Sequence, residues 1–156
     1  MTSKRVKLLH NVIAQAITPV GFKKKGSAWY CQEAEAVLVI SPQRSQYGLR
    51  YYLNLGVYWR ILGEKMTPKV RECQLRSRIE SILPQEKKHL VEHCLDFEDA
   101  SIDDSTRHAV LLDALSLHAI PVLKRCATEE GLRDEYNSGL LVGFLIDKKL
   151  VAALGL

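Results

Sequence analysis

Residues 48–59 read GLRYYLNLGVYW, and apolar side chains alternate with polar ones along them. One set of alternate positions is apolar or aromatic: Leu49, Tyr51, Leu53, Leu55, Val57 and Trp59. The other set carries polar or amphipathic side chains: Arg50, Tyr52, Asn54 and Tyr58. Successive side chains of a β-strand point to opposite faces of a sheet, so this period of two predicts a half-buried strand.

Two further strands are predicted just before this one. Residues 22–59 hold eight of the chain's eleven Phe, Trp and Tyr residues, and aromatic residues favour strands. We expect the first strand at residues 22–32, with a bulge at Gly26, and the second at residues 36–43. The second is apolar on both faces, which indicates a central position. The short connections between the strands predict an antiparallel meander.

An amphipathic helix is predicted before the sheet. Its apolar stripe recurs at helical spacing and comprises Val6, Leu9, Ile13, Ala16, Ile17 and Val20. Thr2 or Ser3 is expected to cap its start, because a side-chain oxygen there can accept from a free backbone N–H. Pro19 and Gly21 are expected to end it.

The C-terminal part of the chain is predicted to be mainly helical. Asp104 or Ser105 is expected to cap a helix that Pro121 kinks or restarts, because proline lacks a backbone N–H and clashes with the preceding turn. Thr128 is expected to cap a short helix that follows. A last helix is expected at residues 140–153.

Residues 73–80 fit either a strand or a helix. A strand would place four polar side chains on one face: Gln74, Arg76, Arg78 and Glu80. A helix would instead align Leu75 and Ile79 with the apolar residues that follow. We favour the strand because it completes a four-stranded sheet. The expected fold is then α+β, an antiparallel sheet of three to four strands with helices packed on one face.

The composition is that of an ordinary soluble globular protein. The 156 residues are 47% hydrophobic and 26% charged, which fits one domain over residues 1–156. A net charge of +4 lends little support to a nucleic-acid partner. The four cysteines form no C-x-x-C pair, and we expect neither a secretory leader nor a membrane-spanning run. These features predict a cytoplasmic protein with free, mostly buried thiols.

Three short motifs resemble those of a bacterial protein family. They read GFKKKG at residues 21–26, SPQRS at residues 41–45 and YLNLGV at residues 52–57. This pattern is similar to the domain of unknown function 4304 family, whose members open with a helix and a GF-basic-basic-x-G turn. The Arg-x-Arg-Ile sequence at residues 76–79 and the leucine-rich C-terminal segment are similar too. The resemblance implies an α+β fold, and it carries over no catalytic residue.

No motif in the sequence indicates a catalytic or metal centre. His89 and His93 could share a helical face beside Cys94, as zinc ligands can, but further ligands are missing. Cys31 or Cys73 could pair with a distant histidine as a nucleophile, although buried inert thiols explain them more simply. We therefore expect no metal and no cofactor, and a non-catalytic protein is the favoured interpretation.

The polar face of the sheet is the strongest candidate binding site. If residues 73–80 pair with the third strand, that face carries Arg50, Tyr52, Asn54, Tyr58, Arg76 and Arg78. Arginine and tyrosine dominate the energetically important positions of protein interfaces. The sequence therefore favours recognition of a protein partner, for example by an immunity-type protein that occludes the active surface of a toxin. If carboxylates such as Glu80 pair with the arginines instead, the face is only structural.

Two other functions are compatible with the sequence. Arg50, Arg76 and Arg78 could hold an anionic small molecule, with Glu80 or a histidine as the base of an enzyme. The lysines at residues 23–25, beside aromatic residues at 29 and 30, could bind nucleic acid weakly. An edge strand protected by lysines explains the second pattern more simply. The sequence carries no information on oligomeric state.

Overall fold

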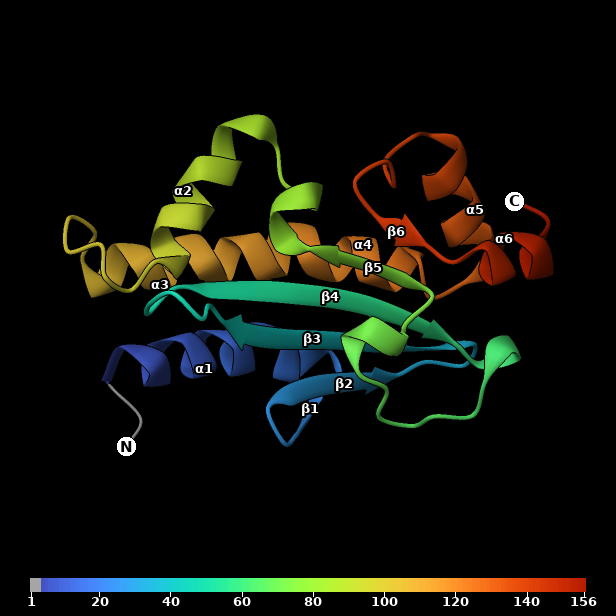
Figure 1. Ribbon diagram of the computed structural model, residues 1–156, viewed down its shortest axis with the longest axis horizontal. Helices are drawn as coiled ribbons and strands as arrows, with labels where there is room; N and C mark the ends of the chain where they lie inside the picture. Colours follow the sequence, from blue (N-terminus) through green and yellow to red (C-terminus); the bar gives the residue numbers. More distant parts are fainter. Residues whose placement is uncertain (1–3) are drawn as a thin grey trace.

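The computed structural model describes residues 4–156 and contains a six-stranded antiparallel sheet, with its strands in chain order from β1 to β6 (Figure 1). The strands are β1 (Lys23–Lys25), β2 (Ala28–Gln32), β3 (Ala36–Arg44), β4 (Tyr51–Trp59), β5 (Leu75–Arg78) and β6 (Leu145–Ile146). The helices are α1 (Lys4–Ile17), α2 (Gln85–Leu95), α3 (Asp104–Asp113), α4 (Ile120–Arg125), α5 (Glu129–Asn137) and α6 (Lys148–Leu154). The predicted α+β class is confirmed, whereas the expected number of three to four strands is wrong.

The predicted first strand is a hairpin of two strands. β1 and β2 pair with Lys23 opposite Tyr30 and Lys25 opposite Ala28. Gly26 does not form the expected bulge. It reverses the chain with a φ of +65°, a left-handed conformation that glycine adopts without steric cost. β1 is an edge of the sheet and its three lysines are exposed, which suits the protection of an open edge.

β3 and β4 form the centre of the sheet. They pair from Ala36 opposite Trp59 to Arg44 opposite Tyr51, and the apolar run of β3 is buried on both faces as predicted. On the other side of β4, Asn54 lies opposite Arg78 of β5. The strand interpretation of residues 73–80 is therefore confirmed over Leu75–Arg78, and a 3-10 turn (Ile79–Ile82) follows.

The C-terminal residues do not form the helix expected at 140–153. Gly139, with a φ of +81°, ends the helical segment of α5, and the chain then returns to the sheet as β6. Leu145 of β6 lies opposite Arg76 of β5. Asp147 then starts α6, and its carboxylate accepts from the backbone N–H of Lys149. Residues 145–146 therefore form backbone hydrogen bonds with the edge of β5. In a helix they could not pair with that edge.

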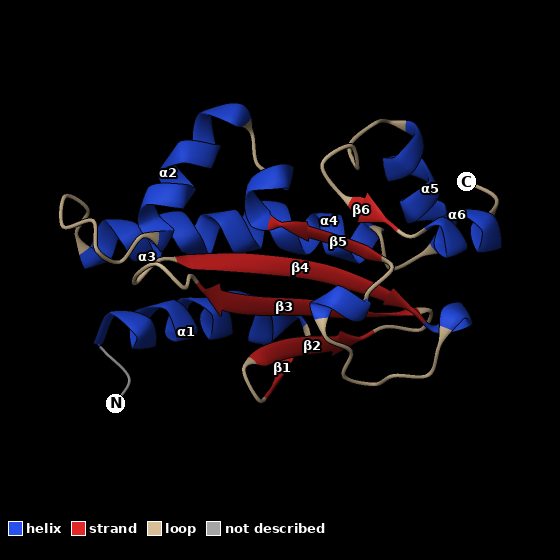
Figure 2. Cartoon of the chain, in the orientation of Figure 1, coloured by secondary structure: helices blue, strands red, loops and turns tan. Residues whose placement is uncertain are grey.

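Helices cover one face of the sheet, which we call the inner face (Figure 2). The fully buried side chains of α1 are Leu9, Val12, Ile13 and Ile17. They pack in one core with Leu38, Ile40, Leu53 and Leu55 of the sheet. Burial of each such side chain stabilises the fold by about 1.5–3 kcal/mol. Val20, which we expected in the stripe, is 37% exposed because it lies in a 3-10 turn after α1. The expected caps Thr2 and Ser3 lie outside the described residues.

Side-chain caps define the starts of two C-terminal helices. Asp103, and not Asp104 or Ser105, caps α3, because its carboxylate accepts from the backbone N–H of Thr106 at 2.7 Å. Because the cap lies one residue before the predicted position, the first turn of α3 begins at Asp104. Thr128 caps α5 as predicted, and its hydroxyl oxygen accepts from a backbone N–H in the first turn.

α3 and α4 are parts of one long helical segment interrupted by a wider turn. Residues Ala114–Ala119 are π-helical, and the N–H of Ile120 donates to the carbonyl of Leu115. Pro121 follows directly, in the first turn of α4. Because proline cannot donate to an α-helical turn, the wider turn lets the chain continue through it. Of the two predicted effects of Pro121, a kink or a restart of the helix, the structure shows α4 beginning one residue before Pro121, directly after the π-helical turn.

The four cysteines are all free and buried, as predicted: Cys31, Cys73, Cys94 and Cys126. Burial raises the pKa of the Cys73 thiol and that of the Cys126 thiol to about 12. Both are therefore protonated and unreactive at neutral pH. Within residues 4–156, no helix is long and apolar enough to cross a membrane.

Candidate functional site

The candidate site lies on the outer face of the sheet, opposite the face covered by α1, α3 and α4 (Figure 1). On β4 this face carries the side chains of Tyr52, Asn54 and Tyr58, while the intervening residues point into the core. The segment after β4 runs across one half of this face and leaves the other half open. The two halves have different chemistry.

The covered half contains Tyr58, which the sequence places in the binding site. Tyr58 is only 5% exposed and packs with Val37, Val39 and Cys73 in a second, small apolar cluster. Its hydroxyl accepts from the backbone N–H of Lys65 at 3.5 Å. Tyr58 therefore holds the covering segment in place and does not reach the open surface.

A glycine allows this cover to lie directly on the sheet. A Cβ atom at Gly56 would lie 2.7 Å from the sulfur of Cys73 and 3.6 Å from the Cα of Val70. Val70 begins the 3-10 turn (Val70–Glu72) that ends the covering segment. The close approach fixes the boundary between the covered and open halves beside β5.

The open half contains a stack of two arginines on one tyrosine, which we call the arginine–tyrosine patch (Arg50, Tyr52 and Arg78). The guanidinium carbon of Arg78 lies 3.8 Å from the centre of the Tyr52 ring, and that of Arg50 lies 5.8 Å away. Arg78 reaches Tyr52 diagonally, since its direct partner on β4 is Asn54. Each exposed cation–π contact contributes about 0.5–1 kcal/mol, enough to orient the arginines.

Arg76 and Asn54 are also held in defined positions. Arg76 donates from Nη1 to the backbone carbonyl of Arg71 at 2.5 Å. Asn54 donates from its amide to Oε1 of Gln43, on β3, at 2.8 Å. The structure thus brings together five of the six site residues proposed from the sequence, Tyr58 being the exception.

The arginines of the open half form no ion pair with a carboxylate of residues 4–156. Among residues 4–156, no carboxylate oxygen lies within 4.0 Å of a side-chain nitrogen of Arg50, Arg71, Arg76 or Arg78. Glu80, the expected partner, is half-buried, and burial raises the pKa of its carboxyl while Arg78 and Arg50 oppose that shift. The guanidinium N–H groups that face solvent are therefore available to an external anion.

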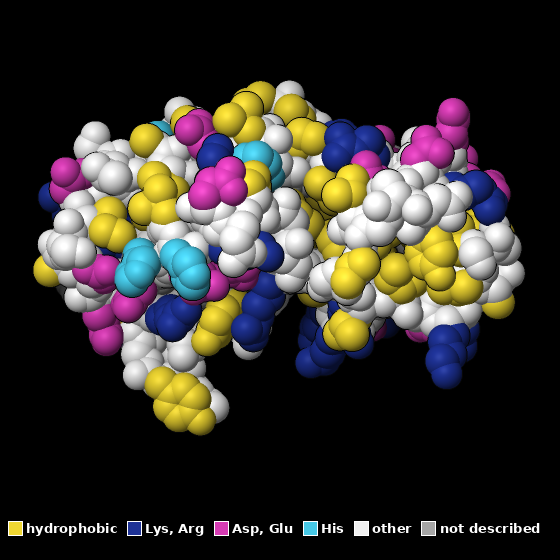
Figure 3. Space-filling view, turned by 90° about the horizontal axis from the view of Figure 1, so that it is seen from above, with side chains coloured by type: hydrophobic (Ala, Val, Ile, Leu, Met, Phe, Trp, Pro, Cys, Tyr) yellow, Lys and Arg dark blue, Asp and Glu magenta, His cyan; other side chains and the backbone are white. Residues whose placement is uncertain are grey.

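A groove of about 280 Å³ runs beside the arginine–tyrosine patch. Asn54, Arg76 and Arg78 line it on the side of β4 and β5, and Ser81, Gly143 and Leu145 line the opposite side. No carboxylate lines this groove. In Figure 3, Lys and Arg side chains gather along the lower edge of the view, on both sides of a hollow between two lobes.

Arg50 lies just before β4 and is placed by a distant loop. It forms an isolated β-bridge with Asp96, and the carbonyl of Leu49 accepts from the N–H of Phe97 at 2.9 Å. The carboxylate of Glu98 accepts from the N–H of Leu49 at 3.2 Å. The loop after α2 therefore takes the place of a neighbouring strand at this point of the sheet.

The loop itself is held by a buried arginine that the sequence analysis missed. Arg107 of α3 is 1% exposed and donates to five backbone carbonyls, those of His93, Cys94, Asp96, Asp99 and Ile102. Its guanidinium also lies over the ring of Phe97, at 4.8 Å. Helical spacing could have revealed its burial, because Arg107 falls on the same helical stripe as the buried Leu111 and Ala114.

The lysines of the basic edge strand (Lys23–Lys25) differ in their contacts. Lys24 points toward the inner side, where its ammonium lies 5.2 Å from the Trp29 ring and 3.5 Å from Nδ1 of His10. Lys23, Lys24 and Lys25 all line an open depression of about 440 Å³, together with Tyr30. The structure therefore brings the three lysines and Tyr30 to one depression, while Lys24 also contacts Trp29.

The residues considered for a metal centre are also separated. Nδ1 of His93 lies 3.2 Å from a carboxylate oxygen of Asp99, whereas Nδ1 of His89 lies 3.8 Å from one of Glu92. Cys94, which follows His93 in the sequence, is fully buried. No group of three His, Cys, Asp or Glu side chains within residues 4–156 is arranged to hold a metal ion.

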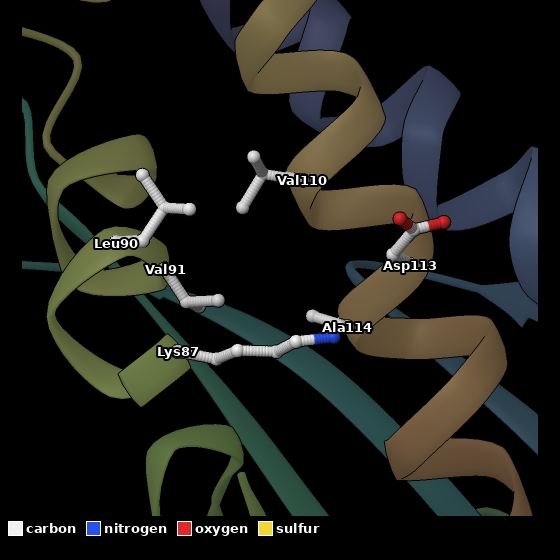
Figure 4. Close-up of a pocket in the computed structure, with 6 residues that line it drawn as sticks. All are labelled: Lys87, Leu90, Val91, Val110, Asp113 and Ala114. Carbon is white, nitrogen blue, oxygen red and sulfur yellow. The ribbon is translucent and has the colours of Figure 1, made fainter. Parts of the chain in front are cut away.

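A second, smaller cleft lies between α2 and α3 (Figure 4). Its volume is about 90 Å³, and its lining is mainly apolar, with Leu90, Val91 and Val110. Lys87 extends across it, while Asp113 stands on the far helix. Ligand sites usually enclose about 300–1,000 Å³, so this cleft is too small to serve as one.

Comparison with known proteins identifies the family to which the chain belongs. Residues 13–125 match the family described as Domain of unknown function (DUF4304). Comparison with curated proteins and with solved structures gave no match. The matched region includes the arginine–tyrosine patch, while Gly143 and Leu145 on the far side of the groove lie beyond it. Because the match covers well over half of its 156 residues, the chain belongs to the DUF4304 family.

Proposed function

We propose that this chain is a cytosolic, non-catalytic binding protein that recognises a protein partner through the open half of the outer face. The observation that carries the proposal is that Arg50, Arg76 and Arg78 are oriented by the protein yet form no ion pair within 4.0 Å with a carboxylate among residues 4–156. The four free, buried thiols support a reducing compartment. An immunity-type protein that covers the active surface of another protein is one form of this function.

A bound partner would supply the acidic groups with which these arginines can form ion pairs. A guanidinium held by stacking on Tyr52 loses little side-chain entropy on binding, so more of each new hydrogen bond contributes to affinity. Arginine and tyrosine are also the residues most often found at the centres of protein interfaces. The patch therefore has both the composition and the rigidity of a recognition surface.

An anionic small molecule is the second candidate ligand. It is favoured by the groove, which Arg76 and Arg78 line together with Ser81 and with no carboxylate. Against it, the groove is open to solvent, whereas small-molecule sites bury most of their ligand. Glu80, the proposed base, does not line the groove. Weak binding of nucleic acid at the basic edge is the least supported candidate, because a net charge of +4 lends it little support.

The test is affinity capture from a lysate of the native host, followed by mass spectrometry and titration with the purified captured protein. Wild type is compared with Arg76→Ala/Arg78→Ala, and with Lys23→Ala/Lys25→Ala as a control that removes the same charge from the opposite end of the sheet. We expect one protein whose binding is lost in the arginine variant and kept in the lysine variant. Equal binding by all three, with circular dichroism showing that all are folded, would contradict the proposal.

A further inference from the structure

We propose that the groove beside β5 binds an extended acidic segment of the partner, with carboxylate side chains at alternate positions. This inference rests on the proposed function and specifies the chemistry of the partner. Three features of the molecule support it: the separation of Arg76 and Arg78, the lining of the groove and the exposed apolar side chains next to the groove.

The two arginines are held at separate places above β4. The Arg78 guanidinium stacks on Tyr52, whereas that of Arg76 is hydrogen-bonded to the carbonyl of Arg71, in the turn that lies over Gly56. They are alternate residues of one strand, so their Cα atoms are about 7 Å apart. Two separate carboxylates, one at each guanidinium, can bind while both arginines keep their present contacts.

An extended peptide supplies carboxylates at the same spacing. Alternate side chains of an extended chain lie on one face and are also about 7 Å apart. A segment of the form acidic-x-acidic, lying along β5, would therefore place one carboxylate at Arg78 and the other at Arg76. Adjacent acidic residues would point in opposite directions, and only one of them would reach the groove.

The walls of the groove favour a peptide over a free anion. Leu145 lies opposite Arg76 in the sheet and is 65% exposed, and Val142 in the same segment is 88% exposed. The segment that forms this wall packs closely against Ser81 at Gly143, because a Cβ atom there would lie 2.9 Å from the Cβ of Ser81. An apolar side chain of the bound segment can cover Leu145, whereas a free anion leaves it in water.

The experiment uses two acetylated, amidated peptides of identical composition and charge, Leu-Glu-Thr-Glu-Val and Leu-Thr-Glu-Glu-Val. Binding to the full chain is followed by NMR, through the Nε–Hε signals of the arginines and the backbone amides of residues 76–78. We expect the alternate peptide to bind about tenfold more tightly, the gain from one additional charge-assisted contact. Arg76→Gln and Arg78→Gln should each reduce its affinity to that of the adjacent peptide, and Lys23→Gln should not.

Several results would overturn the inference. They are equal affinity of the two peptides, absence of binding by both at millimolar concentration, displacement of the alternate peptide by an equal concentration of inorganic phosphate, and tighter binding of a single-stranded oligonucleotide at the same signals. If the peptides fail but a captured protein still requires Arg76 and Arg78, the proposed function stands and only this inference falls. If no captured protein requires them, the proposed function itself fails.

Discussion

The replacement of Arg107 by methionine tests how the protein places Arg50. The guanidinium of Arg107 donates to the carbonyls of Cys94, Asp96 and Asp99 at 2.6–2.9 Å, and to two more carbonyls at 3.4 Å. Methionine keeps much of the side-chain volume and removes every donor. Three strong bonds from a charged donor contribute about 1.5 kcal/mol each, and relief from burying a charge offsets part of their loss. We expect a net loss of about 3 kcal/mol in the free energy of unfolding.

The assay is urea unfolding followed by circular dichroism, with Arg44→Met as the control. Arg44 is an exposed arginine at the end of β3, so its replacement should change the free energy of unfolding by less than about 0.5 kcal/mol. Amide hydrogen exchange should also become faster at Phe97, whose N–H donates to the carbonyl of Leu49. Equal stability of Arg107→Met and Arg44→Met, with unchanged exchange at Phe97, would refute the reasoning.

Three further predictions concern the sheet and its edges. Gly56→Ala should destabilise the protein by about 1–3 kcal/mol in urea unfolding, because its Cβ would overlap the sulfur of Cys73; a neutral effect would show that the covering segment is not packed as described. Cys73 and Cys126, with pKa values near 12, should resist iodoacetamide at pH 8 in the native protein and react in urea, as mass spectrometry can show; rapid native labelling would contradict their burial. Burial raises the pKa of Glu80 above its ordinary value of 4.5, so folding favours the protonated acid and stability falls as the pH rises through the folded pKa. Glu80→Gln should therefore be more stable than wild type at pH 7 and equally stable below pH 4.5, and a constant difference across this range would contradict the assignment.

The parts of the fold that were predicted correctly depend on local patterns. The alternation in residues 48–59 identifies β4, and the helical stripe identifies α1, because both periods are properties of one segment. Gly26 was misassigned because glycine serves both bulges and turns, and only its φ of +65° distinguishes them. β6 was missed because a strand of two residues is stabilised by its partner β5, from a distant part of the sequence.

The candidate site was predicted to the extent that strand alternation determines it. Tyr52, Asn54, Arg76 and Arg78 share a face because β4 and β5 pair in the expected way. Two features depend on contacts that alternation cannot reveal. Tyr58 is buried by the segment after β4, and Arg50 is placed by the loop that Arg107 holds. The far wall of the groove, at Gly143 and Leu145, required knowledge of β6.

The most direct test of the proposed function is an NMR titration of the isotope-labelled chain with its purified captured partner. The central claim is that the open half of the outer face makes the contact. We therefore predict that the arginine side-chain signals of Arg50, Arg76 and Arg78, and the amides of β4 and β5 around them, change on binding, while those of Lys23–Lys25 do not. Changes confined to the basic edge or to the cleft between α2 and α3, with Arg76 and Arg78 unaffected, would contradict the claim.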